Sequence, residues 1–152
     1  MKYFIETRIL GAVRELLVGR VKEVLSKWEY LVPVIEFGKT VSMFTVSPVI
    51  SLSACERTEK ERIIRLDCYT VSITFSMQEH EDVELFCYAY AAAFEKALDE
   101  NVTLGGIADR AVITGKKYNP PKKPNCGEGW ELEITLRVTV NKEKREKKNE
   151  ER

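Results

Sequence analysis

The sequence predicts an α+β fold: a mostly antiparallel sheet of four to five strands, with two helices packed on one face. Two segments alternate between apolar and polar residues, as strands with one buried face do. Their apolar members are Tyr69, Val71, Ile73, Phe75 and Met77, and Trp130, Leu132, Ile134, Leu136, Val138 and Val140. A segment between them repeats apolar residues at spacings of three and four, which places them on one side of a helix. Its members are Val83, Phe86, Cys87, Tyr90, Phe94, Ala97 and Leu98. Hairpin links and a helix crossing between strands favour helices on one side of the sheet.

The N-terminal part predicts one long helix, from about Tyr3 to Lys27. Its apolar stripe consists of Ile5, Ile9, Val13, Leu16, Leu17, Val21, Val24, Leu25 and Trp28. Gly11 and Gly19 interrupt the stripe, and each lowers helix stability by roughly 1 kcal/mol relative to alanine. A break in the helix near Gly19 is therefore one possible outcome. Pro33 does not suit a helix interior and begins an extended segment from Val32 to Phe37.

The next part predicts a β-hairpin. A loop or hairpin tip covers Gly38 to Thr45, and a strand follows from Val46 to Ala54. The residues from Glu56 to Arg62 are all polar and read as the turn. The returning strand runs from about Arg62 to Met77.

This returning strand changes parity near its start. Its first apolar residues, Ile64, Leu66 and Cys68, point to the side opposite Tyr69 and the residues that alternate with it. Either a bulge flips the strand near Asp67 to Tyr69, or the start of the strand is buried on both faces. Asp67 is expected on the solvent face of the sheet or at that bulge.

The second half predicts a helix and two strands. The helix begins at the acidic stretch Glu79 to Asp82, which suits a helix N-terminus, and the Gly105-Gly106 pair turns the chain. A weak strand covers Ile107 to Thr114. A long loop with three prolines follows from Gly115 to Gly129, and the final strand begins at Trp130 and ends at Asn141.

Bulk composition indicates one domain. The chain has 152 residues, and we assign residues 1–141 to a single α+β domain. Residues 142–152 contain no apolar side chain and are expected to be disordered, with a charged helical extension as the alternative.

The 24 basic and 24 acidic residues cancel, so net charge does not favour binding to nucleic acid or to an anionic membrane. No apolar run resembles a membrane span or a signal peptide, so we expect the chain to stay in the cytoplasm where it is made.

Charge is nevertheless distributed unevenly along the chain. The segment from Glu79 to Glu100 contains seven acidic residues and one lysine, Lys96. The segment from Gly115 to Gly129 contains four lysines and one glutamate. Separated patches of opposite sign suit head-to-tail contact between copies. Ordinary solvated faces are the alternative interpretation.

The sequence offers little for chemistry. Its single histidine, His80, lies among helix-start residues with no evident nucleophile beside it. Its four cysteines show no metal-ligand spacing. We therefore expect no enzyme activity, no cofactor and no metal site.

Several of these features together resemble the tail terminator proteins of long-tailed bacteriophages, also called tail completion or minor tail protein U-like proteins. The resemblance spans residues 5–141 and is one of pattern and size. Besides the N-terminal amphipathic helix, it rests on Val32 to Ile35, the alternating strand Asp67 to Phe75, the helix ending at Ala97-Leu98, Leu104-Gly105-Gly106, and the strand Trp130 to Val138.

The resemblance implies a structural virion protein, phage- or prophage-encoded, that forms a homo-oligomeric ring, typically a hexamer, on the tail tube. Such a ring ends tube polymerisation and provides the head-joining surface. The implied partners are other copies of the chain, the tail tube protein and head–tail connector proteins, with passive contact to DNA crossing the channel. The implied location is the bacterial cytoplasm during assembly and the virion tail afterwards, with no role for a membrane.

Two alternative functions remain open. One is a different phage neck or connector protein, and the other is a regulatory domain that binds a small ligand in a helix–sheet crevice near Tyr90 and Trp130.

The candidate contacts with other subunits, the tube or the channel lie in two basic segments. They are Arg57, Lys60 and Arg62 in the predicted turn, and Lys116, Lys117, Lys122 and Lys123 in the predicted loop. We expect one of these basic segments to meet an acidic face of the next subunit formed by Glu84, Glu95 and Asp99.

Overall fold

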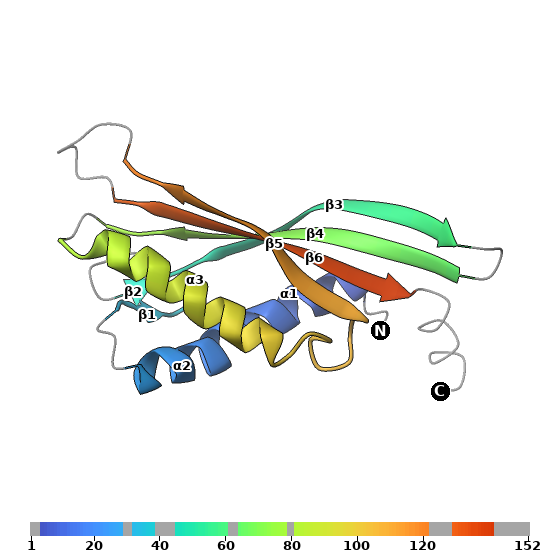
Figure 1. Ribbon diagram of the computed structural model, residues 1–152, viewed down its shortest axis with the longest axis horizontal. Coiled ribbons are helices and arrows are strands. Elements are labelled where there is room, and N and C mark those ends of the chain that lie inside the picture. The colour runs from blue at the N-terminus through green and yellow to red at the C-terminus, as the bar shows by residue number, and fades with distance from the viewer. Residues whose placement is uncertain are drawn as a thin grey trace.

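In the computed structural model, two helical segments pack on one face of a four-stranded antiparallel sheet (Figure 1). The structure describes residues 4–28, 32–38, 45–60, 64–78, 81–121 and 129–141, apart from the side chains of residues 59, 60 and 64. The α+β arrangement predicted from the sequence is confirmed.

The N-terminal helical segment is continuous but not uniform. Helix α1 (Ile5–Leu16) passes into a π-helical turn, η1 (Leu17–Val21), and then into α2 (Lys22–Lys27). Gly19 lies inside η1, so the helix widens there and does not break. The side facing the sheet contains the buried residues Ile9, Val13, Leu17, Val21, Val24 and Leu25.

Four strands follow the first helical segment. Strands β1 (Val34–Ile35) and β2 (Thr45–Val46) form a separate parallel pair. Strands β3 (Val49–Lys60) and β4 (Ile64–Ser76) form a long antiparallel hairpin. Figure 1 shows this hairpin extending well past the end of α3, above the start of α1.

Helix α3 (Val83–Asp99) connects this hairpin to the last two strands, β5 (Arg110–Asn119) and β6 (Glu131–Asn141). Strand β6 inserts between β4 and β5, which gives the order β3-β4-β6-β5. Every neighbouring pair in this sheet is antiparallel, so the outer strands β3 and β5 run in opposite directions.

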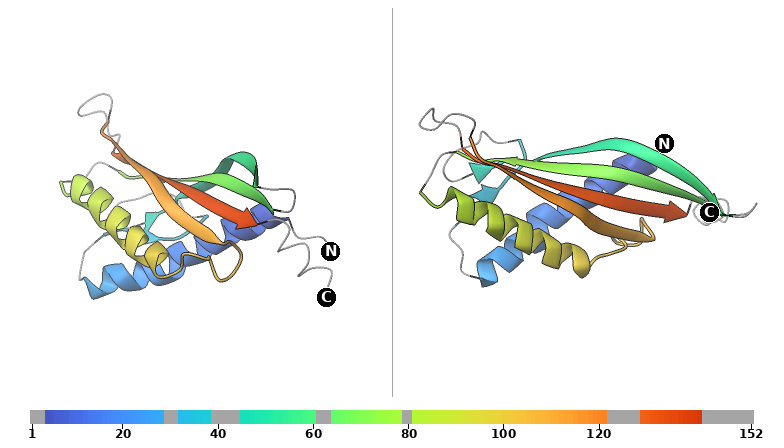
Figure 2. Two further views of the ribbon diagram at one scale, coloured as in Figure 1. Left: turned by 45° about the vertical axis from the view of Figure 1, so that its right-hand side comes forward. Right: turned by 45° about the horizontal axis from the view of Figure 1, so that its top comes forward.

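The core lies between the sheet and the helices. The alternating residues predicted on β4 and β6 are buried, as is the predicted stripe of α3. Ile73 of β4 lies opposite Ile134 of β6, and the Phe75 ring stacks on Tyr90 of α3 with 5.2 Å between centroids. No helix of the described residues lies on the opposite face of the sheet (Figure 2). Apart from Leu66, its described side chains on the two central strands are polar or small: Cys68, Thr70, Ser72, Thr74 and Ser76 on β4, and Glu131, Glu133, Thr135, Arg137, Thr139 and Asn141 on β6.

Both outer strands are longer than the sequence predicts. β3 continues to Lys60, so Arg57 and Lys60 belong to a strand and not to a turn. β5 begins at Arg110 and continues to Asn119, so Lys116 and Lys117 are strand residues and not part of a long loop. Polar residues extend these strands because each outer strand needs a backbone partner on only one side. Arg57 is paired with Asp67 and Lys116 with Ile134.

The change of parity in β4 does not come from a bulge in that strand. The register between β4 and β6 runs without a shift from Leu66 to Ser76, and the bulge lies in β3, between Leu52 and Ala54. The prediction for Asp67 is wrong, because Asp67 shares the helix-side face of β4 with Tyr69 and is 1% exposed. Leu66 and Cys68 are half-buried on the other face.

Candidate functional site

A groove of about 680 Å³ lies on the helix side of the molecule. One wall is formed by residues of α1, η1 and α2, and the other by the turn that follows α3. Its lining residues are Arg8, Gly11, Ala12, Glu15, Leu16, Arg20, Glu23, Asn101, Leu104, Gly105 and Ile107. The set combines small and apolar residues with four charged ones, Arg8, Glu15, Arg20 and Glu23.

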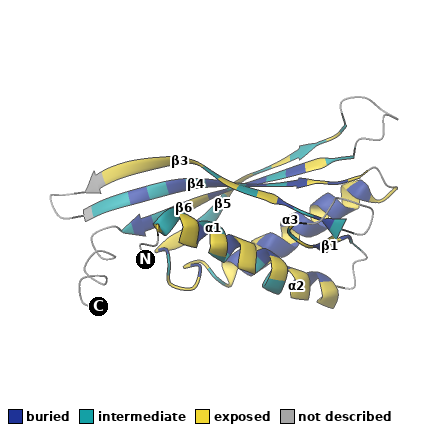
Figure 3. Cartoon of the chain, turned by 180° about the vertical axis from the view of Figure 1, so that it is seen from behind, coloured by how far each residue is buried: buried dark blue, intermediate teal, exposed yellow. Residues whose placement is uncertain are grey.

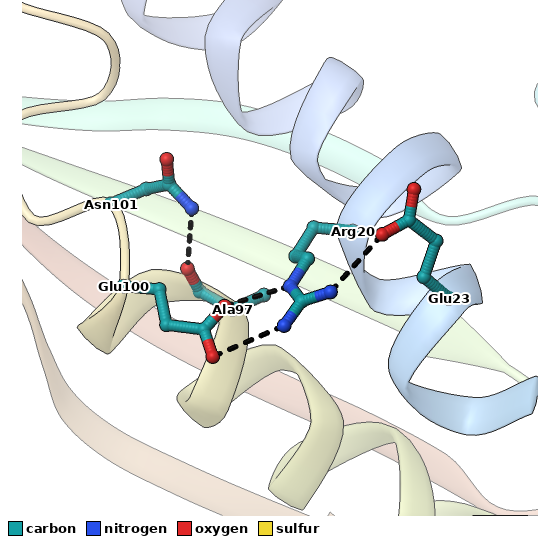
Figure 4. Close-up of polar contacts among 5 residues, drawn as sticks. All are labelled: Arg20, Glu23, Ala97, Glu100 and Asn101. Carbon is teal, nitrogen blue, oxygen red and sulfur yellow. Dashed lines mark hydrogen bonds and ion pairs between the residues drawn. The ribbon is translucent and has the colours of Figure 1, made fainter. Parts of the chain in front are cut away.

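An ion-pair cluster fixes the distance between the two walls (Figure 4). The Arg20 guanidinium on η1 donates two hydrogen bonds to Glu100 at the end of α3, at 2.7 and 3.2 Å. A third bond, 3.1 Å long, goes to Glu23 on α2. Because Arg20 and Glu100 are 80 positions apart, the cluster ties the first helical segment to the C-terminus of α3.

The electrostatics of this cluster follow from its hydrogen bonds. The bonds from Arg20 hold the pKa of the Glu100 carboxyl below its ordinary value of 4.5, because they stabilise the charged form. The same bonds raise the pKa of Arg20. Both side chains therefore remain charged at neutral pH and form a fixed ion pair at the edge of the groove.

The second wall is a tight turn with unusual backbone angles. The Asn101 side-chain amide donates to the Ala97 carbonyl, 3.0 Å away, at the end of α3. Leu104, Gly105 and Gly106 then have φ values of 50°, 72° and 88°, in the left-handed region that glycine tolerates best. Leu104 adopts this region while its side chain is 5% exposed, so burial of that side chain offsets the backbone strain.

Two of the predicted contact residues form ion pairs inside the chain. Arg57 lies within 2.9 Å of the buried Asp67 carboxylate, and Lys116 lies 2.5 Å from Glu95 on α3. Lys116 comes from the predicted basic segment and Glu95 from the predicted acidic face, so these segments meet within one copy. The expectation that they also meet between subunits stays a prediction.

The other predicted contacts are dispersed. Glu84 accepts a hydrogen bond from the Tyr88 hydroxyl at 2.6 Å, which raises the pKa of Tyr88. Asp99 is exposed at the end of α3, and Lys117 lies opposite Glu133 on the sheet face that carries no helix. Lys60 ends β3. Arg62, Lys122 and Lys123 lie outside the described residues, as do His80, Cys126 and residues 142–152.

No crevice opens at Tyr90, contrary to the ligand-binding alternative. Tyr90 is 0% exposed, and its hydroxyl donates a hydrogen bond to the Pro33 carbonyl. Burial raises the pKa of this hydroxyl. Trp130 borders a separate surface hollow beside Pro120, Pro121 and Gly129.

Sequence reasoning missed the groove entirely. Its two walls come from segments about 80 residues apart, and most lining residues belong to ordinary helical surface patterns. Gly11 was the one sequence feature that pointed to the groove. A glycine inside an amphipathic helix lowers helix stability, so its presence indicates a packing or functional role at that position.

Two further findings concern the described ranges only. No group of three or more His, Cys, Asp or Glu side chains there is placed to hold a metal ion. None of the helices in those ranges combines the length and apolar character that crossing a bilayer requires.

The chain matches no known protein family, and a search of curated proteins likewise finds no match.

Proposed function

We propose that this chain is the subunit of a cyclic assembly, and specifically a structural virion protein that caps the tail tube of a long-tailed bacteriophage. In this role the ring ends polymerisation of the tube and provides the surface to which the head is joined. The observation on which the proposal rests is the pair of long outer strands, β3 and β5, at opposite edges of one sheet.

Both edges offer backbone groups for pairing. β3 has 12 residues and β5 has 10, and among the described residues no strand pairs with the outer side of either. The start of β5 is closed, since the Ala111 amide donates to the Val102 carbonyl at 2.6 Å. Long open edges are templates for pairing with another chain, so a protein that keeps them needs a partner or a cover.

The strand directions favour head-to-tail pairing. Because β3 and β5 run in opposite directions, β5 of one copy beside β3 of the next continues the antiparallel order without a break. This contact joins two different surfaces and is therefore heterologous. Repeated contacts of this kind close into a ring when the rotation per copy divides a full turn.

The polar sheet face supports the same proposal. Its hydroxyl and charged side chains on β4 and β6 are compatible with an aqueous channel, whereas an apolar face would need a cover. The assignment to a phage tail, and not to another ring, rests on the resemblance of the sequence pattern to tail terminators. A neck or connector ring is the alternative that the experiment must separate.

The experiment measures mass by light scattering over a concentration series, images large species by negative stain, and adds the protein to polymerising tail tube subunits. We expect rings of about six copies and shorter tubes that carry a ring at one end. Asp99→Lys should weaken ring formation at low salt if the acidic face contributes. Rings that leave tube length unchanged would favour a neck protein, and a monomer that ignores tube ends would contradict the proposal.

A further inference from the structure

One face of α1, beside the groove, is exposed, and no other helix of the described residues packs on it. At 100° per residue, Arg8, Gly11 and Glu15 lie on the side opposite the buried Ile9, Val13 and Leu17. Figure 3 shows this outer side of the helix as exposed. Apolar residues are exposed at both ends of the face: Phe4 is 67% exposed and Val18 is 42% exposed.

This face is open to a neighbouring backbone. A Cβ atom built on Gly11 or on Gly19 would meet nothing within 4 Å. Arg8 and Glu15 are both exposed, and no hydrogen bond or ion pair joins the side chain of either to another residue of the described ranges. The face therefore presents two charged side chains and two exposed apolar side chains, and its centre, at Gly11, has no side chain.

The arrangement of these residues is symmetric about one point. The midpoint between Gly11 and Ala12 lies 3.5 residues, about one helical turn, from both Arg8 and Glu15. The two charges at this equal separation are opposite. An antiparallel copy of the same helix centred on this point places its Glu15 beside Arg8 and its Arg8 beside Glu15.

We propose that α1 is a two-fold docking surface whose occupant is α1 of a second copy of this chain, laid antiparallel along the groove. Small residues at the crossing point allow the two helices to approach closely. Phe4 of each copy then falls opposite the turn of the other that holds Val18 and Gly19. A contact of this kind is isologous, because the same patch serves both partners.

This inference goes beyond the proposed ring and does not depend on it. The two-fold contact uses the helix side of the molecule, whereas ring closure uses the outer strands of the sheet. The two contacts also differ in symmetry, so a variant that loses one is expected to keep the other.

Charge reversal tests the pairing directly. In Arg8→Glu, two copies bring the introduced carboxylate of each against Glu15 of the other, and in Glu15→Arg they bring the introduced guanidinium against Arg8. Each variant alone should lose the dimer. Mixed one to one, the two variants should form heterodimers in which both pairs are opposite in charge. The introduced carboxylate of one copy meets the introduced guanidinium of the other, and Glu15 of the first meets Arg8 of the second.

Native mass spectrometry with one variant isotope-labelled counts the heterodimers, and circular dichroism confirms that each variant folds.

Two matched variants complete the design. Glu131→Arg makes the same charge change on an exposed β6 residue of the sheet face opposite the helices and should leave the dimer intact. Gly11→Ala fits the isolated chain but enlarges the crossing point, so it should raise the thermal midpoint while raising the dimer dissociation constant several-fold. Heterodimers in the mixture, with neither homodimer present, would establish the contact. Homodimers of either single variant as abundant as those of the unmodified chain, or a mixture without heterodimers, would overturn it.

Discussion

Asp67 is the one charged residue among the buried side chains of the described core, and its burial leads to a prediction about Arg57. The Asp67 carboxylate accepts hydrogen bonds from Arg57 at 2.9 and 3.5 Å, while the Arg57 side chain is 51% exposed. Arg57→Leu should lower the free energy of unfolding by about 1–3 kcal/mol, because a buried carboxylate loses donors. Arg57→Leu combined with Asp67→Leu should recover much of that loss.

Urea denaturation measures both variants, with Arg110→Leu as the control at another exposed strand arginine. If Arg57→Leu costs no more than Arg110→Leu, other groups satisfy Asp67, and the ion pair is not the main reason for its burial.

Gly129 gives a second prediction for a single residue. A Cβ atom there would lie 1.5 Å from the Met77 carbonyl oxygen, a contact that only a shift of the backbone could relieve. The nearby hydrogen bond from the Met77 amide to the Trp130 carbonyl, at 2.9 Å, holds the two segments together. Gly129→Ala should therefore lower the free energy of unfolding by about 1–3 kcal/mol.

Gly11→Ala is the matched control, because its Cβ atom meets nothing and the helix gains about 0.5–1 kcal/mol. Thermal unfolding of the two variants, at a concentration too low for association, should give shifts of opposite sign. A neutral Gly129→Ala would mean that the segment before Trp130 moves freely away from Met77.

At the scale of elements, the link between η1 and α3 predicts a dependence of stability on pH. The pKa of Glu100 is lowered in the folded chain, mainly by its hydrogen bonds from Arg20. A carboxyl of this kind stabilises the fold above its unfolded pKa, near 4.5, and this contribution is lost as the pH falls through the lower folded pKa. Arg20→Gln should remove that contribution, so its stability should fall less steeply than that of the unmodified chain below pH 4.5.

A carboxyl titration by NMR gives the direct measurement. The Glu100 resonance should titrate closer to pH 4.5 in Arg20→Gln than in the unmodified chain. Identical titrations would show that the contact between Arg20 and Glu100 does not persist in solution. Glu23→Gln is the comparison that keeps Arg20 and its bonds to Glu100.

The strands buried on one face were predictable from sequence over their full length, whereas the ends of the edge strands were not. β4 and β6 lie between two neighbours and against the helices, so their alternation reports burial directly. β3 and β5 extend beyond their predicted ends because residues such as Thr58 and Lys117 obtain backbone partners without burial. The groove could not be predicted from the sequence, because it depends on how α1 packs beside a turn about 80 residues away.

For the whole molecule, the two proposed contacts leave different signatures in backbone hydrogen exchange. Pairing of β5 with β3 of the next copy adds hydrogen bonds to outer amides of both strands, so exchange there should slow on assembly. Amides in the central strands β4 and β6 are bonded on both sides already and should change little. Docking of α1 on α1 joins side chains, and its amides keep the helical bonds they have.

Exchange measured by mass spectrometry above and below the assembly concentration separates the cases. Protection gained in Val49–Lys60 and Arg110–Asn119 supports closure through the sheet edges. The Ala111 amide serves as an internal reference, because it already donates to Val102 in the isolated chain. A large assembly in which β3 and β5 exchange as fast as in the monomer would mean that the ring closes through another surface, and the role assigned to the open edges would be wrong.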